Sequence, residues 1–282
     1  MRGEAAISLR QVREYWEGYA ERVLARGNHG DVRGHLEALR RDHELAYGLA
    51  NQLLLRRGIR GRALLELGCG LGFDTVFFSG VGAYVVAVDL SGSCVRWTRR
   101  HLAWHGLEAE VGVANAECLD LPAGCFDMVT VRGLLMFTPD PAAVLEEAWR
   151  VLRPGGTIQA ILHHRYSWYV LLGAVGRMNL VDPVQEPQPN RLYTRRDIRA
   201  LFKRFTDVAI TLDRFPTIGS RRAGPAASLY NRLCVPLARR LPGRVLLPFG
   251  FYLIVQGTKP GADGRPDPCS ANGPSPRGAL QW

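Results

Sequence analysis

The distribution of apolar residues predicts helices at the start of the chain, followed by a series of short buried strands. Val12, Trp16, Tyr19 and Val23 follow helical spacing and would share one face of a first helix. The polar break GNHGD separates it from a second helix, expected from about residue 35 to residue 57. Short apolar runs then alternate with helical patterns from residue 63 onward, which favours an open α/β sheet.

One stretch of this series carries candidate chemistry: ALLELGCGLGFDTVFFSGVGAYVVAVDLS, from Ala63 to Ser91. It predicts a strand at 64–67, a glycine turn, a helix, and a second strand at 84–88 that ends on Asp89. The turn holds Gly68, Gly70 and Gly72, and glycine suits it because the backbone must bend sharply and admit a ligand close to its amides. An acid at the tip of the next strand is placed to hold a pair of ribose hydroxyls.

The spacing ELGCGLG followed by VDLS resembles the class I S-adenosylmethionine-dependent methyltransferases more than the nicotinamide dehydrogenases. The glycines follow GxGxG, and Glu66 stands two residues before the first of them. A dehydrogenase turn serves a pyrophosphate on a helix N-terminus, whereas S-adenosylmethionine has no phosphate to hold. The run EEAWRVLRPGG, ahead of the fifth expected strand, is a second and independent marker of the same family.

The resemblance implies a Rossmann-like, seven-stranded α/β sheet with a reversed last hairpin and helices on both sides. Residues 1–58 would then form an N-terminal helical lid, and residues 59–165 the core that binds S-adenosylmethionine. Residues 166–259 would hold a substrate-cap insertion and the final strands. The Pro/Gly/Ser-rich residues 260–282 are expected to be a disordered tail.

The resemblance also implies roles in cofactor binding for residues along this core. Glu66 would serve the methionine amino group, and the glycine turn with Cys69 would line the methionine and the ribose. Asp89 and Leu90 would receive the ribose hydroxyls. The adenine would be flanked by Asn115, Ala116 and Glu117, with Asn115 in the place of the family's usual acid but still able to donate and accept hydrogen bonds. Arg132, which follows the fourth strand, would face the cofactor or the substrate cleft.

Candidates for catalysis follow the fifth strand in HHRYSW, similar to a bacterial subgroup with a His-Arg-Tyr-Ser segment. A base is needed only for a hydroxyl or an acidic carbon, and the candidates are His163, His164 and Tyr166. Anchoring of the next helix is an equally good interpretation for each. Related sequences commonly carry two histidines in the loop after the fourth strand, where this chain has Met136 and Phe137. The residues expected at the substrate or in the lid are Tyr15, Trp16, Tyr19, Met136 and Arg165, and simple packing is the alternative for the three aromatic ones.

No metal site is expected. His101 and His105 are four residues apart on a helix expected from Ser91, but neither an intervening acid nor a third ligand is evident. They are therefore interpreted as two partly exposed histidines. The six cysteines show no CxxC or zinc-type pairing, which suits a reducing, cytoplasmic location.

Composition narrows the class of partner. The 282 residues carry a net charge of +10, almost entirely through arginine spread along the chain. That distribution disfavours nucleic acid, and VRGLLMF lacks the motifs of base-modifying enzymes after the fourth strand. Basic and apolar residues alternate over 221–248 and would fit a membrane surface, but the prolines there favour a packed insertion. No apolar run could span a bilayer, and no signal-peptide core is present.

The resulting expectation is a bacterial enzyme of secondary metabolism that moves a methyl group from S-adenosylmethionine to a small acceptor by in-line displacement. A natural-product, quinone-like or lipid-like acceptor is compatible with the sequence, and O, N and C methylation stay open. Two alternatives use the same cofactor without methyl transfer: an enzyme for chemistry such as intramolecular cyclisation, and a non-catalytic binding module. Methylation of RNA is a weaker alternative, and the oligomeric state is not encoded in any pattern.

Overall fold

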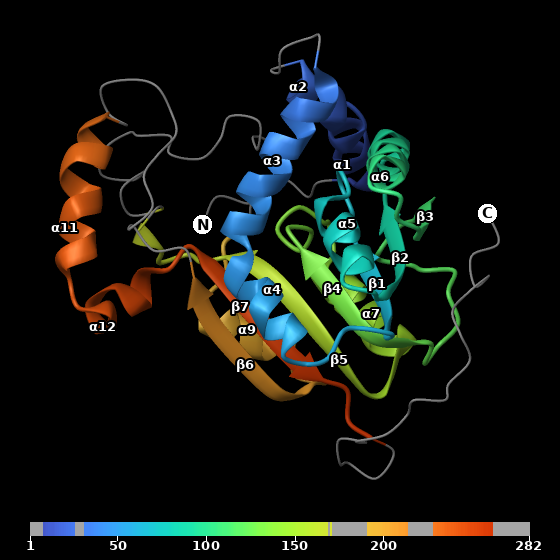
Figure 1. Ribbon diagram of the computed structural model, residues 1–282. Helices are drawn as coiled ribbons and strands as arrows, with labels where there is room; N and C mark the ends of the chain where they lie inside the picture. Colours follow the sequence, from blue (N-terminus) through green and yellow to red (C-terminus); the bar gives the residue numbers. More distant parts are fainter. Residues whose placement is uncertain (1–7, 26–30, 169, 171–190, 214–227, 262–282) are drawn as a thin grey trace.

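The computed structural model describes residues 8–25, 31–168, 170, 191–213 and 228–261. Its centre is a seven-stranded sheet with the order β3-β2-β1-β4-β5-β7-β6, drawn in Figure 1. The strands are β1 (Ala63–Leu67), β2 (Tyr84–Asp89), β3 (Glu110–Val113), β4 (Phe126–Arg132), β5 (Leu152–His163), β6 (Thr206–Asp213) and β7 (Tyr252–Thr258).

The strand directions confirm the expected sheet with a reversed last hairpin. β3, β2, β1, β4 and β5 run parallel, whereas β7 is antiparallel to both β5 and β6. β1 lies between β2 and β4, so the chain crosses the sheet at this point and leaves a crevice at the carboxyl ends of β1 and β4. The glycine turn leaves β1 directly into that crevice.

Helices cover both faces of the sheet because the buried side chains alternate between them. On β1, Leu65 and Leu67 pack in one apolar cluster with Val144 of α7, whereas Leu64 packs in another with Phe78 of α5. The helices of this core are α5 (Phe73–Gly80), α6 (Gly92–Trp104), α7 (Pro141–Val151) and α9 (Arg195–Leu201). The N-caps of the last three are Ser91, Asp140 and Thr194, whose side chains each accept a backbone N–H in the first turn.

The N-terminal region contains four helices where two were expected. They are α1 (Leu9–Glu17), α2 (Tyr19–Leu24), α3 (Val32–Ala46) and α4 (Gly48–Leu55). The first pair breaks at Gly18, where glycine costs helix stability, and the second breaks at Tyr47. Glu17 accepts the Ser93 N–H at 3.0 Å and Glu21 the Ser93 hydroxyl at 2.7 Å, which fastens α1 and α2 to the start of α6.

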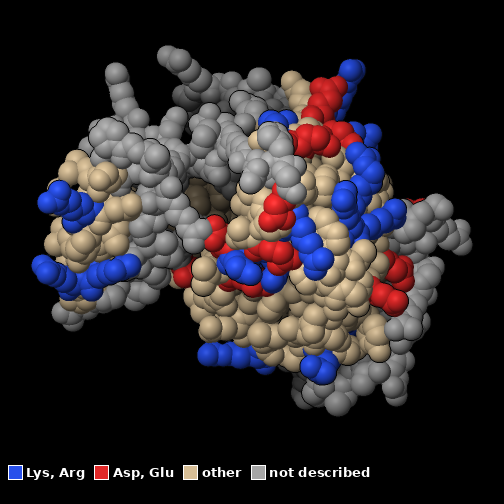
Figure 2. All heavy atoms as spheres, turned by 45° about the horizontal axis from the view of Figure 1, so that its top comes forward, with Lys and Arg blue, Asp and Glu red and all other residues tan. Residues whose placement is uncertain are grey.

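A separate group of helices precedes β7: η2 (Tyr230–Cys234), α11 (Val235–Arg240), α12 (Gly243–Leu246) and η3 (Leu247–Phe249). Leu229, Leu233 and Leu237, spaced four residues apart, are more than half exposed. Figure 2 shows basic and no acidic side chains on this lobe, while both signs mix over the rest of the visible face. No helix among the described residues has the length and apolar character needed to cross a bilayer.

Three expectations fall partly or wholly outside the described residues. They are the apolar helix and polar segment over 167–193, the first part of the basic and apolar stretch over 221–248, and nearly all of the tail after residue 260. The fifth strand, expected from Thr157, begins at Leu152 instead. Arg153 forms an ion pair of 2.8 Å with Asp127 on β4, and the strand is already buried at this point.

Two glycines with similar positive φ angles allow the cost of the backbone conformation to be distinguished from the cost of crowding. Gly72 and Gly124 have φ of +79° and +70°, but only at Gly72 would a Cβ strike backbone, 2.9 Å from the Thr98 Cα. We expect Gly124→Ala to lower the free energy of unfolding by about 1–2 kcal/mol, and Gly72→Ala by a further ~1–3 kcal/mol of overpacking. Urea denaturation measures both, and equal losses would show that the contact with α6 carries no strain.

Candidate cofactor and acceptor pocket

The glycine turn between β1 and α5 is built from three residues in the left-handed region of φ. Gly68, Gly70 and Gly72 have φ of +83°, +55° and +79°, values that other residues rarely adopt. A Cβ at Gly68 would lie 2.9 Å from the Leu134 side chain, so this glycine also allows a close approach of the chain after β4. A Cβ at Gly70 would meet no atom within 4 Å. Gly70 therefore presents its backbone to open space.

The carboxylate of Asp89 fixes the position of this turn. One oxygen accepts the Gly70 N–H at 2.9 Å, and the other accepts the Ser91 N–H at 2.9 Å. Burial raises the pKa of Asp89, although the backbone N–H groups counteract that effect. The acid at the end of β2 and the turn after β1 are thus one hydrogen-bonded unit.

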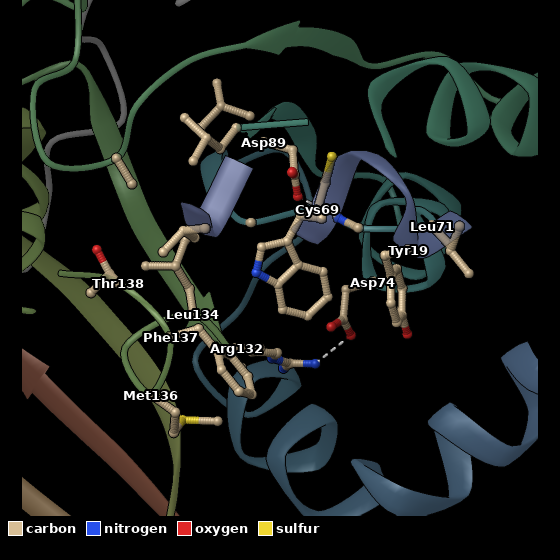
Figure 3. A pocket seen from close by; sticks show the side chains of 18 of the residues that line it. Tyr19, Cys69, Leu71, Asp74, Asp89, Arg132, Leu134, Met136, Phe137 and Thr138 are labelled. Carbon is tan, nitrogen blue, oxygen red and sulfur yellow. Dashed lines mark hydrogen bonds and ion pairs between the residues drawn. The ribbon is translucent and has the colours of Figure 1, made fainter. Parts of the chain in front are cut away.

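A pocket opens over this unit, at the carboxyl ends of the strands. Its empty space, including the part open to solvent, is about 1300 Å³. Figure 3 shows Asp89 and Cys69 on one side, with Leu134 and Phe137 on another wall. The lining combines the N-terminal helices α1 to α3, the turn with the start of α5 and the end of β2, the segments after β3 and β4, and the paired ends of β5 and β7.

A buried ion pair forms the floor of the pocket, and Figure 3 shows its dashed contact. The Arg132 guanidinium donates to Asp74 at 2.6 Å, to Asn51 at 2.7 Å and to Gln159 at 2.7 Å. Its side chain is only 4% exposed. Asn51 lies on α4, so the arginine joins β4 to α5, β5 and the N-terminal helices.

His43 of α3 completes this group, with its Nε2 atom 3.0 Å from the second oxygen of Asp74. Burial would raise the pKa of Asp74, but the charge of Arg132 and the contact with His43 outweigh it and hold that pKa below its ordinary value. The neighbouring Tyr47 stacks on Tyr252 with ring centroids 5.3 Å apart. The floor therefore carries a fixed carboxylate and guanidinium beside an aromatic wall.

Comparison with known proteins gives a family match for the core of the chain. Residues 65–160 match the family model described as "Methyltransferase domain", and this segment contains both sequence markers and the turn with its acid. By this match, residues 65–160 are a methyltransferase domain.

Solved structures share the fold of this methyltransferase domain. An S-adenosylmethionine-dependent methyltransferase from Thermotoga maritima, described as a possible histamine N-methyltransferase, has a TM-score of 0.57 at 18% identity, covering 88% of this chain and 99% of its own. Magnesium protoporphyrin IX methyltransferase from Synechocystis, with bound S-adenosylhomocysteine, has a TM-score of 0.56 at 13% identity, covering 89% of this chain and 100% of its own. At these identities the likeness concerns the fold alone.

Curated relatives match the methyltransferase domain more closely in sequence. The ubiquinone biosynthesis O-methyltransferase of Thiobacillus denitrificans is 35% identical over 124 residues, which are 43% of this chain and 53% of that protein. The enzyme of the same name from Aromatoleum aromaticum is 34% identical over 102 residues, 36% and 44% of the two chains. The chain thus spans about half the length of these relatives.

Most residues predicted to hold the cofactor line the pocket of the methyltransferase domain. They are Gly68, Cys69, Gly70, Asp89, Leu90, Asn115, Ala116 and Arg132. Trp16, Tyr19 and Met136, predicted for the lid or the substrate, line it as well. The lining does not include Glu66, Gly72, Glu117, Tyr15, Arg165, His164 or Tyr166.

The three predicted cofactor residues outside the lining make contacts within the protein, and their roles at the ligand stay predictions. Glu66 accepts the Thr75 hydroxyl at 2.7 Å, and burial with the nearby charge of Asp74 raises its pKa well above the ordinary value. Glu117 accepts the Asp140 N–H at 2.9 Å and thus fixes the loop before α7. Gly72 faces α6, as its contact with Thr98 indicates.

Of the three catalytic candidates, one lines the pocket and two do not. His163 lines the pocket and stacks on Phe251 with centroids 4.5 Å apart. His164 is buried outside the lining, with its Nδ1 atom 3.1 Å from the Gly250 carbonyl oxygen, and Tyr166 is 58% exposed. Arg165 donates to the Leu192 carbonyl at 3.1 Å. Alternate residues of an extended segment point to opposite sides, which accounts for the different surroundings of the two histidines.

Sequence reasoning missed Asp74, His43, Tyr47 and Tyr252, which all line the pocket. Asp74 was detectable as a charge in the apolar helix that follows the glycine turn. The other three come from α3, the α3–α4 junction and β7, and no sequence spacing connects them to the turn.

The interpretation of His101 as partly exposed is wrong. Its side chain is fully buried, with its Nδ1 atom 3.1 Å from the Leu71 carbonyl oxygen. A third residue of metal-ligand type, Glu37 of α3, lies against both His101 and His105. Glu37 lies more than sixty positions before either histidine in the sequence, so no local spacing points to it.

The buried ion pair predicts a large effect of one substitution. Arg132→Met leaves the buried Asp74 carboxylate without its guanidinium partner, and we expect a loss of about 3–5 kcal/mol in the free energy of unfolding. Combining it with Asp74→Asn should recover part of that loss, because no uncompensated charge remains. Arg10→Met, at a fully exposed ion pair, should leave the urea midpoint unchanged. A loss at Arg132 no greater than that at Arg10 would contradict this account.

Proposed function

We propose that this protein transfers a methyl group from S-adenosylmethionine to the hydroxyl of a small aromatic acceptor, quinone-like in shape. The observation that carries the proposal is the shared pocket, which joins the glycine turn and Asp89 to a wall of aromatic side chains. The turn supplies the cofactor side of the pocket and the aromatic wall the acceptor side.

The residues around the turn fit the cofactor. Gly70 leaves open space where any other residue would place a Cβ, so a ligand can approach its backbone. Asp89 would hold the ribose hydroxyls, while Asn115 and Ala116, also at the pocket, would flank the adenine. When bound there, S-adenosylmethionine supplies an electrophilic methyl group. Glu66, Gly72 and Glu117 would support these residues through the contacts described above.

The acceptor side favours a flat aromatic molecule. Trp16 of α1 meets Phe137 edge to face with centroids 5.4 Å apart, and Tyr47, Tyr252 and His163 form a stacked group. Aromatic rings pack well in offset and edge-to-face geometry. α1 lies over this side through Leu9, Val12 and Trp16, and would exclude water from the reacting groups. The name of the curated relatives, O-methyltransferase, supports a hydroxyl acceptor.

His163 is our candidate for the base, because it alone among the three sequence candidates lines the pocket. A ring nitrogen of His163 would take the proton of the acceptor hydroxyl as the new O–C bond forms, and S-adenosylhomocysteine would leave. The pocket contributes mainly alignment, which can supply about 7–11 kcal/mol of a barrier in favourable cases.

Calorimetry tests the cofactor side. We expect wild-type protein to bind S-adenosylmethionine and S-adenosylhomocysteine with a micromolar Kd, or about −8 kcal/mol. Asp89→Ala removes the acceptor for the ribose hydroxyls and releases the Gly70 N–H, so binding should weaken by roughly tenfold to hundredfold. Asp120→Asn, an exposed acid outside the pocket, is the matched control. Wild-type protein that binds neither ligand at roughly millimolar concentration would refute the assignment.

Turnover tests the base. With a panel of dihydroxylated aromatic compounds, we expect His163→Gln to lower kcat by about 10²–10⁴-fold, the usual contribution of a general base. Tyr166→Phe should leave kcat unchanged, because that side chain lies outside the pocket. Unchanged kcat in His163→Gln would exclude His163 as the base. Consumption of S-adenosylmethionine without S-adenosylhomocysteine would indicate chemistry other than methyl transfer.

A further inference from the structure

Three side chains from two helices converge behind the glycine turn, outside the pocket. His101 lies on α6, His105 follows the end of α6, and Glu37 lies on α3. The Glu37 Oε1 atom is 3.0 Å from the His105 Nε2 atom and 3.6 Å from the His101 Nε2 atom. The three ligand atoms lie within 4.8 Å of one another.

The hydrogen bonds of the two rings decide which nitrogen carries a proton. The Nδ1 atom of His101 is 3.1 Å from the Leu71 carbonyl oxygen, and the Nδ1 atom of His105 is 3.0 Å from the His101 carbonyl oxygen. A carbonyl oxygen only accepts, so each Nδ1 must donate. In the neutral rings each Nε2 therefore presents a lone pair, and both lone pairs face the Glu37 carboxylate. A backbone carbonyl on the far nitrogen is the usual orienting contact of a metal-binding histidine.

A cation between the Nε2 atom of His101 and the Oε1 atom of Glu37 would be electrostatically favourable. His101 Nε2 and Glu37 Oε1 are buried and have no hydrogen-bond partner, and the His101 side chain is 0% exposed. A buried acceptor that faces another acceptor without a proton or a cation between them is unfavourable. The other oxygen of Glu37 is already occupied by Arg40, at 3.0 Å. Oxygen Oε1 is thus left for a different cation.

We propose that Glu37, His101 and His105 bind a divalent transition-metal ion of the zinc type. Ligands about 2.0–2.2 Å from a tetrahedral zinc ion are separated by roughly 3.3–3.6 Å. The separation of 3.6 Å to His101 lies at the upper end of that range, and the separation of 3.0 Å to His105 lies slightly below it. Side-chain exposures of 24% at His105 and 19% at Glu37 leave room for water as a fourth ligand. Two imidazole nitrogens exclude a preference for Mg²⁺ or Ca²⁺, which select oxygen.

The ion would hold the cofactor turn in place without touching the reacting groups. His101 contacts the Leu71 carbonyl of that turn, and Glu37 belongs to α3, which also brings His43 to the pocket floor. A metal bond between them would connect α3, α6 and the turn. None of the three residues lines the pocket, so the site is structural.

A metal-binding measurement on the purified full chain, freed of metal by a chelator, tests this inference. In competition with a chromophoric chelator, we expect wild-type protein to bind one equivalent of Zn²⁺, and Co²⁺ to give the visible absorption of a tetrahedral site. Glu37→Gln and His105→Ala should each weaken Zn²⁺ binding at least tenfold. His35→Gln, a histidine on the same helix outside the cluster, and Cys118→Ser, an exposed thiol, should bind as wild type does.

The wild-type protein alone can overturn the proposal. Binding of less than one equivalent of Zn²⁺ would do so, whether or not the variants fold, and so would equal binding by wild type, Glu37→Gln and His105→Ala. Circular dichroism establishes that the variants are folded. Because the probe is the metal ion alone, the result does not depend on the methyl acceptor or on cofactor binding.

Discussion

The two hydrogen bonds accepted by Asp89 are the constraint on which the rest of the site depends. They join the turn after β1 to the chain after β2, so two neighbouring strands end at one common edge. The positive φ angles of the turn expose the Gly70 backbone at that edge, and the same carboxylate faces the pocket. A side chain at Gly70, or the loss of Asp89, would remove the seat for a nucleoside while leaving the sheet intact.

The second layer of the site lies outside the segment that matches the family model. Residues 65–160 supply the turn, Asp89, Asp74 and Arg132, whereas α1, α3, α4 and β7 supply Trp16, His43, Asn51 and Tyr252. The ion pair of Arg132 and Asp74 links the two parts, because Asn51 and His43 bind to it. The glycine turn and Asp89 thus lie within the matched segment, whereas Trp16, Tyr47 and Tyr252 of the aromatic wall lie outside it.

The sequence was most informative where local chemistry determines local structure. The glycine turn follows from backbone geometry, and the seven-stranded sheet with a reversed last hairpin, which the resemblance implied, is confirmed. Glu66 and Gly72 were assigned to the ligand by resemblance, and those roles stay predictions; in the structure Glu66 accepts the Thr75 hydroxyl and a Cβ at Gly72 would meet Thr98. The floor of the pocket and the group of Glu37, His101 and His105 were not predictable, because their members are brought together only by packing between helices far apart in sequence.

A crystal structure with S-adenosylhomocysteine tests the central claim most directly. We predict electron density for the nucleoside across Gly68 and Gly70, with the ribose hydroxyls within hydrogen-bonding distance of the Asp89 carboxylate and the sulfur facing the aromatic wall. A ligand bound elsewhere, or one whose ribose makes no contact with Asp89, would contradict it.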